Sequence, residues 1–227
     1  GDFTTLGPTI QAFSGITCLT SFSRKIASSS AHNDREKIIK NPPLGLGYSY
    51  ADVVAGLFAA LAVLAALEYR DTTGQGQYID ISEYEAMCSL LGPAILDYTI
   101  NHNVATPQGN SPGYIPAAPY GCYKCLGNDR WCTIAVFTEE EWQALCHVLG
   151  NPAWSKKKKF STFSARKRHI EELNEFLEQW SAQHTPEEVM TLLQQAGIPA
   201  GIVEDANNLA NDPHLAVRNF FAQVDHP

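Results

Sequence analysis

The sequence predicts an α/β protein, with a helical first half followed by a small α+β domain. Three observations predict this class. A long Ala-rich apolar segment follows Asp52, Pro and Gly are concentrated in residues 103–119, and short alternating runs mixed with capped helical segments come after them. Alternation with a period of two is typical of strands, whereas apolar residues three and four apart are typical of helices. Because a mainly helical part and a part that mixes both patterns lie on either side of a Pro- and Gly-rich segment, two units joined by a linker are expected.

Composition excludes several classes of function. The chain has 227 residues, enough for one large domain or two small ones at roughly 100–200 residues per domain. Its 44% of hydrophobic and 18% of charged residues are typical of a globular protein. With 16 Lys and Arg against 24 Asp and Glu, the net charge is -8. This charge argues against nucleic acid or an anionic membrane as the main partner.

The cysteines and the longest apolar run indicate a cytoplasmic location. Six cysteines in a chain of this length do not indicate the disulfide framework of short secreted proteins. The apolar run from Val53 to Leu67 covers about 15 residues, fewer than the roughly 20 that cross a bilayer. We therefore expect a cytoplasmic protein with reduced thiols and no membrane contact. Because the chain begins at Gly1 without an initiator Met, we also expect a piece of a longer protein.

Helical patterns dominate the first half. Residues 8–19 predict a short helix or turn, and the polar, Ser-rich residues 20–41 predict a mobile loop. From Asp52 to Arg70 the pattern predicts a long helix that is apolar nearly all round. Such a helix is typical of burial in a large core or an interface.

One strand is expected to interrupt these helices. Residues 77–82 alternate between polar and apolar, which predicts a strand. Ser82, followed by Glu83 and Glu85, is the expected N-cap of a second apolar helix over 83–100.

Strands and capped helices alternate in the second half. The runs 120–126 and 130–137 flank a Gly-Asn-Asp turn and predict a hairpin. Thr138 and Thr185 are each followed by Glu three residues later, which predicts two capped helices. The remaining expected elements are helices over 139–149, 164–182 and 186–196 and a strand over 198–203.

Four short motifs are more specific together than any one of them alone. They are Asp52-x-x-Ala55-Gly56; Arg70-x-x-Thr73-Gly74-x-Gly76-Gln77-x-Ile79-Asp80-Ile81-Ser82; Gly197-Ile198-Pro199-Ala200-Gly201; and Asp212-Pro213-His214-x-x-x-Arg218-x-Phe220-Phe221. Together they resemble the family III CoA-transferases, the CaiB/BaiF group that includes formyl-CoA transferase and carnitine CoA-transferase. The resemblance implies an enzyme that moves CoA between an acyl-CoA and a carboxylic acid, with coenzyme A as a substrate and no permanently bound cofactor.

The resemblance also implies how the chain is divided. Residues 1–105 would be the helical part of a Rossmann-like large domain, 106–119 a linker or flap, 120–203 the small α+β domain, and 204–227 a linker returning to the large domain. In the family, a region before this segment supplies most CoA contacts, so the 227 residues alone are expected to be inactive. Members form interlocked homodimers, which would place the apolar helix after Asp52 at a subunit interface.

Asp52 matches the catalytic aspartate of the family. There, this carboxylate attacks the acyl-CoA carbonyl to give a mixed anhydride, which CoA thiolate converts to an aspartyl thioester. A helix start suits the role because backbone N–H groups and the helix dipole stabilise a carboxylate and oxyanions formed beside it. From the residue pattern alone, a plain N-cap also explains Asp52.

Two further sets of residues are candidates. Gly109, Asn110 and Gly113 lie where some relatives of the family place a glycine-bearing flap over the active site, although a plain linker explains them too. Cys122 and Cys125 have the C-x₂-C spacing of zinc sites. On a strand, however, residues three apart point to opposite faces, and no second such pair follows, so no metal is expected.

Two other functions stay open. An enzyme resembling α-methylacyl-CoA racemase would use the same aspartate position with a histidine to move a proton at the α-carbon. That histidine would come from the region before this segment. A degenerate relative that acts as a binding or assembly module is a different class, and the presence of Asp52 argues against it.

Overall fold

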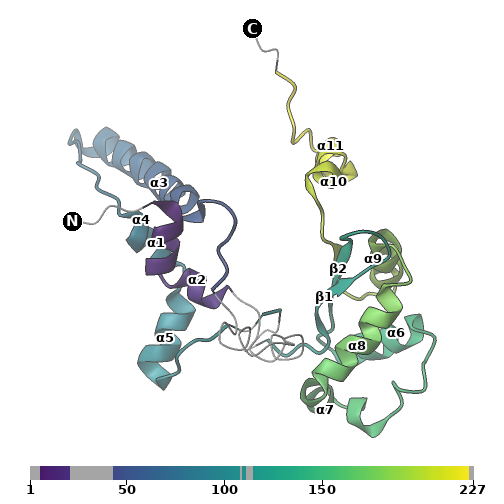
Figure 1. Cartoon of the computed structure of the whole chain (residues 1–227). Helices are drawn as coiled ribbons and strands as arrows, with labels where there is room; N and C mark the ends of the chain where they lie inside the picture. The colour runs from purple at the N-terminus through teal and green to yellow at the C-terminus, as the bar shows by residue number, and fades with distance from the viewer. Residues whose placement is uncertain (1–5, 21–42, 108, 111–114, 225–227) are drawn as a thin grey trace, which may run out of the picture. The chain divides into compact units, whose positions relative to one another are not determined.

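The computed structural model describes residues 6–20, 43–107, 109–110 and 115–224 (Figure 1). The chain divides into two compact units, Gly1–Gly109 and Asn110–Pro227. The first unit is helical, and the second combines helices with a small antiparallel sheet, which confirms the predicted fold class. The loop predicted over 20–41 lies, apart from Thr20, outside the described residues.

The first unit has its core where three helices meet. Its helices are α1 (Gly7–Phe13), α2 (Ile16–Leu19), α3 (Tyr50–Thr73), α4 (Glu83–Ser89) and α5 (Gly92–Asn101). Helices α1, α3 and α4 contact one another. The buried apolar residues at this junction are Ile10, Ala51, Val54, Ala55, Ala86 and Met87. The first turns of α3 are therefore its best-packed part.

Helix α3 is longer than the sequence predicts. It covers 24 residues and ends at Thr73, and the residue after it is Gly74, whose φ of 74° glycine adopts without steric cost. Most of its large apolar side chains are exposed in this chain, among them Leu57, Leu61 and Leu64. By length and composition alone α3 could cross a membrane, the one helix among the described residues of which this holds. The prediction that this apolar segment is too short to cross a membrane is thus wrong. Core helices of soluble proteins can, however, be equally long and apolar.

Two expected elements of the first unit differ from the structure. Residues 77–82 have no regular structure, because no strand in the described part of this unit lies beside them to complete a ladder of hydrogen bonds. The helix expected over 83–100 is divided into α4 and α5, and Pro93 lies in the first turn of α5. Proline lacks the N–H that would continue α4. The expected cap is confirmed, since the Ser82 hydroxyl accepts a hydrogen bond from the Glu85 N–H at 3.3 Å.

The second unit is built on a three-stranded antiparallel sheet in the order β1-β2-β3. The strands are β1 (Tyr120–Lys124), β2 (Trp131–Ala135) and β3 (Ala200–Ile202), as the predicted hairpin and third strand require. Across the sheet, Cys122 pairs with Thr133, which pairs in turn with Gly201. The next pair along, Tyr123 and Cys132, points to the other face and is buried.

Helices cover that buried face. They are α6 (Glu139–Val148), the short 3₁₀ helix η2 (Lys158–Phe160), α7 (Phe163–Arg168), α8 (Ile170–Ser181) and α9 (Pro186–Gln195), of which α8 and α9 contact the sheet (Figure 1). The predicted capping boxes at Thr138 and Thr185 are both formed. The helix expected over 164–182 is interrupted at His169, whose backbone leaves the helical region. The core of the unit includes Ile134, Trp142, Leu145, Phe160, Leu173, Leu177, Val189 and Leu193.

Residues 204–224 contain two short helices that sequence reasoning missed. These are α10 (Ala206–Ala210) and α11 (Pro213–Val217). Asp205 and Asp212 cap them, accepting hydrogen bonds from Asn208 N–H and Leu215 N–H. The Arg130 side chain donates to the Asn208 side chain at 2.9 Å, which ties α10 to the hairpin. An acidic cap followed by Pro, as at Asp212, is the signal that would have found α11.

One buried charge joins several segments of the second unit. The Arg166 side chain is 2% exposed and forms two hydrogen bonds of 2.8 and 3.0 Å with the Glu139 carboxylate. It also donates to the carbonyls of Ala118 at 3.1 Å and Phe160 at 3.3 Å. The guanidinium carbon lies 4.6 Å from the ring centroid of Trp142. A buried guanidinium is tolerated because its donors are paired in this way.

Arg166→Met should therefore destabilise the second unit by about 3 kcal/mol, the low end for breaking a buried ion pair because Glu139 is half exposed. All four tryptophans of the chain lie in this unit, so their fluorescence during urea unfolding reports on it. Arg168→Met, an exposed position on the same helix, should change the free energy of unfolding by less than about 0.5 kcal/mol. Equal losses in the two variants would contradict this assignment.

The Glu139 carboxylate should make this stability depend on pH. Its hydrogen bonds to the Arg166 guanidinium hold the pKa of Glu139 below its ordinary value of 4.5. A pKa depressed by folding adds stability above the unfolded-state pKa, and this contribution is lost as the pH falls through the folded-state pKa. Urea unfolding below pH 4.5 should thus show a smaller fall in stability for Glu139→Gln than for the unchanged protein. Glu140→Gln, exposed on the same turn, should leave the pH profile unchanged.

Candidate active site

Asp52 lies in the first turn of α3, where its side chain is exposed. The helix begins at Tyr50, and the N-cap position belongs to Ser49, so a capping role for Asp52 is wrong. As the third helical residue, Asp52 lies next to the backbone N–H groups that lack partners within the helix. Those groups and the dipole of a 24-residue helix favour a carboxylate at this position.

Helix α1 comes very close to this turn. A Cβ atom on Gly7 would lie 2.6 Å from Ser49 Oγ and 2.9 Å from Asp52 Oδ1, distances that atoms do not tolerate. One turn further along α1, Gln11 donates from Nε2 to the Tyr48 carbonyl at 2.8 Å. Sequence reasoning missed both α1 residues, because nothing in the spacing of residues 7–11 indicates a contact with residues 48–52.

The candidate flap residues fall on both sides of the unit boundary. Gly109, the last residue of the first unit, has a φ of 60° in a turn. Asn110 belongs to the second unit and lines a hollow there. Gly113 lies outside the described residues. The role of these three residues as a flap stays a prediction.

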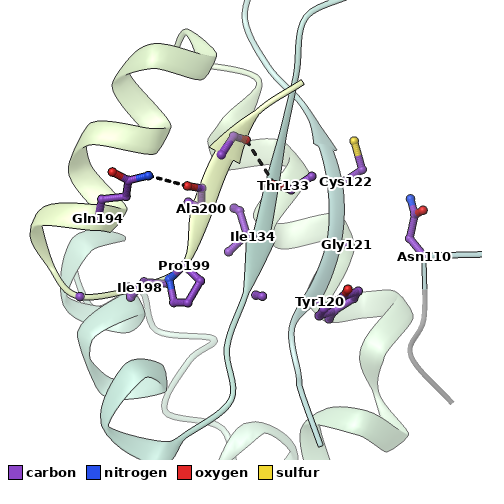
Figure 2. Close-up of a pocket in the computed structure, with 13 residues that line it drawn as sticks. Asn110, Tyr120, Gly121, Cys122, Thr133, Ile134, Gln194, Ile198, Pro199 and Ala200 are labelled. Atoms are coloured by element: carbon purple, nitrogen blue, oxygen red, sulfur yellow. Dashed lines mark hydrogen bonds between the residues drawn. The ribbon is translucent and has the colours of Figure 1, made fainter. Parts of the chain in front are cut away.

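The hollow lies in the second unit, over the sheet face opposite the helical core, and has a volume of about 720 Å³. The motif Gly197–Gly201 forms one wall, and Tyr120, Cys122 and Thr133 contribute the strand side (Figure 2). Gln194 lies at this wall and donates from Nε2 to the Ala200 carbonyl at 2.8 Å. No Asp, Glu, Lys, Arg or His side chain is among its described lining residues. This chemistry suits an uncharged part of a ligand.

The three cysteines of the hairpin do not form one cluster, because the Cys125 and Cys132 thiols contact each other and Cys122 lies apart from them. Cys122 is half-buried at the hollow, whereas Cys125 and Cys132 are buried in the core. Burial raises the pKa of all three thiols. Within the described ranges, no three His, Cys, Asp or Glu side chains are grouped so that they could hold a metal ion.

The chain belongs to CoA-transferase family III, whose family model matches residues 4–227. It is 30% identical over 187 residues to succinyl-CoA–D-citramalate CoA-transferase of Chloroflexus aurantiacus, which covers 82% of this chain and 46% of that protein. It is 29% identical over 186 residues to succinyl-CoA:mesaconate CoA-transferase of Haloarcula marismortui, covering 82% and 45%. The predicted family is therefore confirmed.

The fold agrees with a solved structure of the same group. A CaiB/BaiF family protein from Brucella suis superposes with a TM-score of 0.77 and 27% identity, over 92% of this chain and 50% of that one. The chain thus spans about half the length of the relatives it matches.

The two faces of the hairpin should differ in thiol reactivity. Iodoacetamide at mildly alkaline pH should alkylate Cys122 in the folded protein, while Cys132 reacts only after denaturation, because the buried thiol is inaccessible and its pKa is raised. Peptide mapping by mass spectrometry measures both sites. Labelling of Cys132 as fast as Cys122 in the folded protein would show that the strand faces are assigned wrongly.

Proposed function

We propose that the protein carrying this chain transfers CoA from an acyl-CoA to a carboxylic acid, with Asp52 as the covalent carrier. Family membership supports the reaction class, and the curated relatives described above are named as CoA-transferases that use succinyl-CoA. The observation that carries the assignment to this residue is the exposed Asp52 carboxylate in the first turn of α3. These transferase names favour CoA transfer over proton exchange at the α-carbon.

The proposed reaction has four steps. An Asp52 carboxylate oxygen attacks the thioester carbon of the acyl-CoA, and CoA leaves as thiolate from the mixed anhydride that forms. The thiolate attacks the Asp52 carbonyl carbon, which releases the first acid as a carboxylate and leaves an aspartyl CoA thioester. The acceptor carboxylate then attacks this thioester, giving a second mixed anhydride and CoA thiolate. Attack of the thiolate on the acceptor's carbonyl yields the new acyl-CoA and restores Asp52.

The position of Asp52 addresses the main difficulty of this chemistry. A carboxylate is a weak nucleophile, so rate enhancement depends on holding it against the thioester carbon. Each addition step also places negative charge on a carbonyl oxygen. The N–H groups in the first turn of α3, which have no acceptor inside the helix, would stabilise such an oxyanion if it formed beside them.

A homodimer is the assembly that we propose. Helices α3 and α5 each expose several large apolar side chains in this chain, and exposed apolar surface of this kind is typical of an interaction site. These side chains include Leu57, Phe58, Leu61, Leu64, Leu67, Ile95, Leu96 and Ile100. A second subunit, together with the rest of each protein, would cover them.

Asp52→Asn separates catalysis from structure. In the full-length protein it should lower the transfer rate at least about 1,000-fold, because the amide cannot form an anhydride. Its thermal unfolding midpoint should stay within about 2 °C, since Asp52 is exposed and is not the N-cap. The assay follows exchange between succinyl-CoA and a dicarboxylic acid, and hydroxylamine trapping during turnover should mark Asp52.

Asp71→Asn is the matched control, because Asp71 is an exposed carboxylate at the other end of the same helix. Its ion pair with Arg70 is exposed and contributes little. Activity should stay within about twofold of the unchanged protein. Near-normal transfer by Asp52→Asn, with the control also active, would disprove the assignment.

A further inference from the structure

Helix α1 presents one buried face, and part of that face is polar. Gly7, Ile10, Gln11 and Ser14 are buried and recur three and four residues apart, so they share one side of the helix. Gln11 is 2% exposed, although its side-chain amide would be well solvated in water. Burying an amide costs free energy unless it forms hydrogen bonds. Its burial therefore needs a specific partner rather than mere apolar contact.

The partner lies in the loop that leads into α3. Gln11 Nε2 donates to the Tyr48 carbonyl at 2.8 Å, across 37 residues of sequence. Tyr48 immediately precedes Ser49, the N-cap of α3. The hydrogen bond therefore holds the backbone two residues before the helix begins, four residues before Asp52. Ser14 Oγ donates to the Gln11 carbonyl at 3.0 Å, which adds a second hydrogen bond at this buried turn.

The second contact is steric. Gly7 lies one turn before Gln11, and its Cα approaches both Ser49 and Asp52 so closely that any side chain would collide with Ser49 Oγ and Asp52 Oδ1. Pro8 follows at the start of α1, where its ring restricts the backbone of the same turn. The backbone of α1 thus forms a wall against one side of the Asp52 carboxylate.

We propose that Gln11 and Gly7 are positioning residues for the Asp52 carboxylate, a role that rests on the function proposed above. Gln11 sets where the first turn of α3 begins, and Gly7 limits the rotamers and lateral movement of Asp52. Nucleophilic attack by a carboxylate needs near-contact geometry, and a displacement of about 1 Å costs on the order of 100-fold in rate. The two α1 residues would therefore act on kcat without touching the substrate.

Gly7→Ala tests the steric contact. The added methyl group should displace the Asp52 carboxylate and lower kcat about 10-fold to 100-fold in the full-length protein, while KM for both substrates stays within about twofold. Gly45→Ala is the matched control in the loop before α3, because its Cβ would meet no atom within 4 Å. The control should keep kcat within about twofold. Normal kcat in a folded Gly7→Ala protein would overturn the role of Gly7.

Gln11→Met tests the hydrogen bond, since Met has a similar volume but no donor. We expect a lower kcat at temperatures where circular dichroism shows a folded protein, and slower single-turnover labelling of Asp52 by hydroxylamine. A purely structural Gln11 would lower the unfolding midpoint and leave kcat per folded molecule unchanged, which would overturn its positioning role.

Hydrogen exchange keeps this test separate from the proposed function. Amide exchange over residues 53–56, whose N–H groups are the first in α3 with acceptors inside the helix, should be faster in Gln11→Met than in the unchanged protein, whatever reaction the protein catalyses. Unchanged exchange there would overturn the proposal on its own. The proposed function would instead be refuted if the full-length protein without any substitution had no transfer activity, or if the Asp52→Asn variant were active.

Discussion

The second unit depends on the pairing of one buried guanidinium. Removing Arg166 from water costs free energy unless each donor finds an acceptor, and the acceptors come from segments far apart in the sequence. Glu139 lies on α6, the Phe160 carbonyl ends η2, and the Ala118 carbonyl stands two residues before β1. The hydrogen bond from Arg166 to the Ala118 carbonyl therefore fixes the backbone just before β1, whose first residue, Tyr120, lines the hollow. An apolar side chain of similar size would fill the space without selecting this arrangement.

In the first unit, a buried neutral group, the Gln11 side-chain amide, likewise requires a specific hydrogen-bond partner. The core of this unit is small, and half of the six buried residues in it are Ala, whose apolar contacts alone would tolerate a small shift of one helix along another. The buried Gln11 amide does not tolerate it, because a shift would leave a polar group unpaired. A polar contact inside a small apolar core can thus define the position of a neighbouring side chain, here Asp52, the nucleophile that we propose.

Helix α3 is well packed at its start and exposed along most of the rest of its length. Its first turns are packed against α1 and α4, whereas most of its length exposes apolar side chains that water solvates poorly. The homodimer that we propose would cover this surface. The Asp52 carboxylate lies at the better-packed end of α3, where its backbone is held by α1 and its side chain is exposed.

The local features of this protein could be predicted from its residues alone. The capping boxes at Thr138 and Thr185, the hairpin and the family all followed from residues within a few positions of one another or from motif spacing. The expected strand over 77–82 failed because alternation cannot supply a neighbouring strand. The pairing of Arg166 and the contact of α1 with the start of α3 were decided only by tertiary structure. Arg166 and Glu139 are 27 positions apart and Gln11 and Tyr48 are 37 apart, and no local pattern encodes which distant acceptor a buried donor will meet.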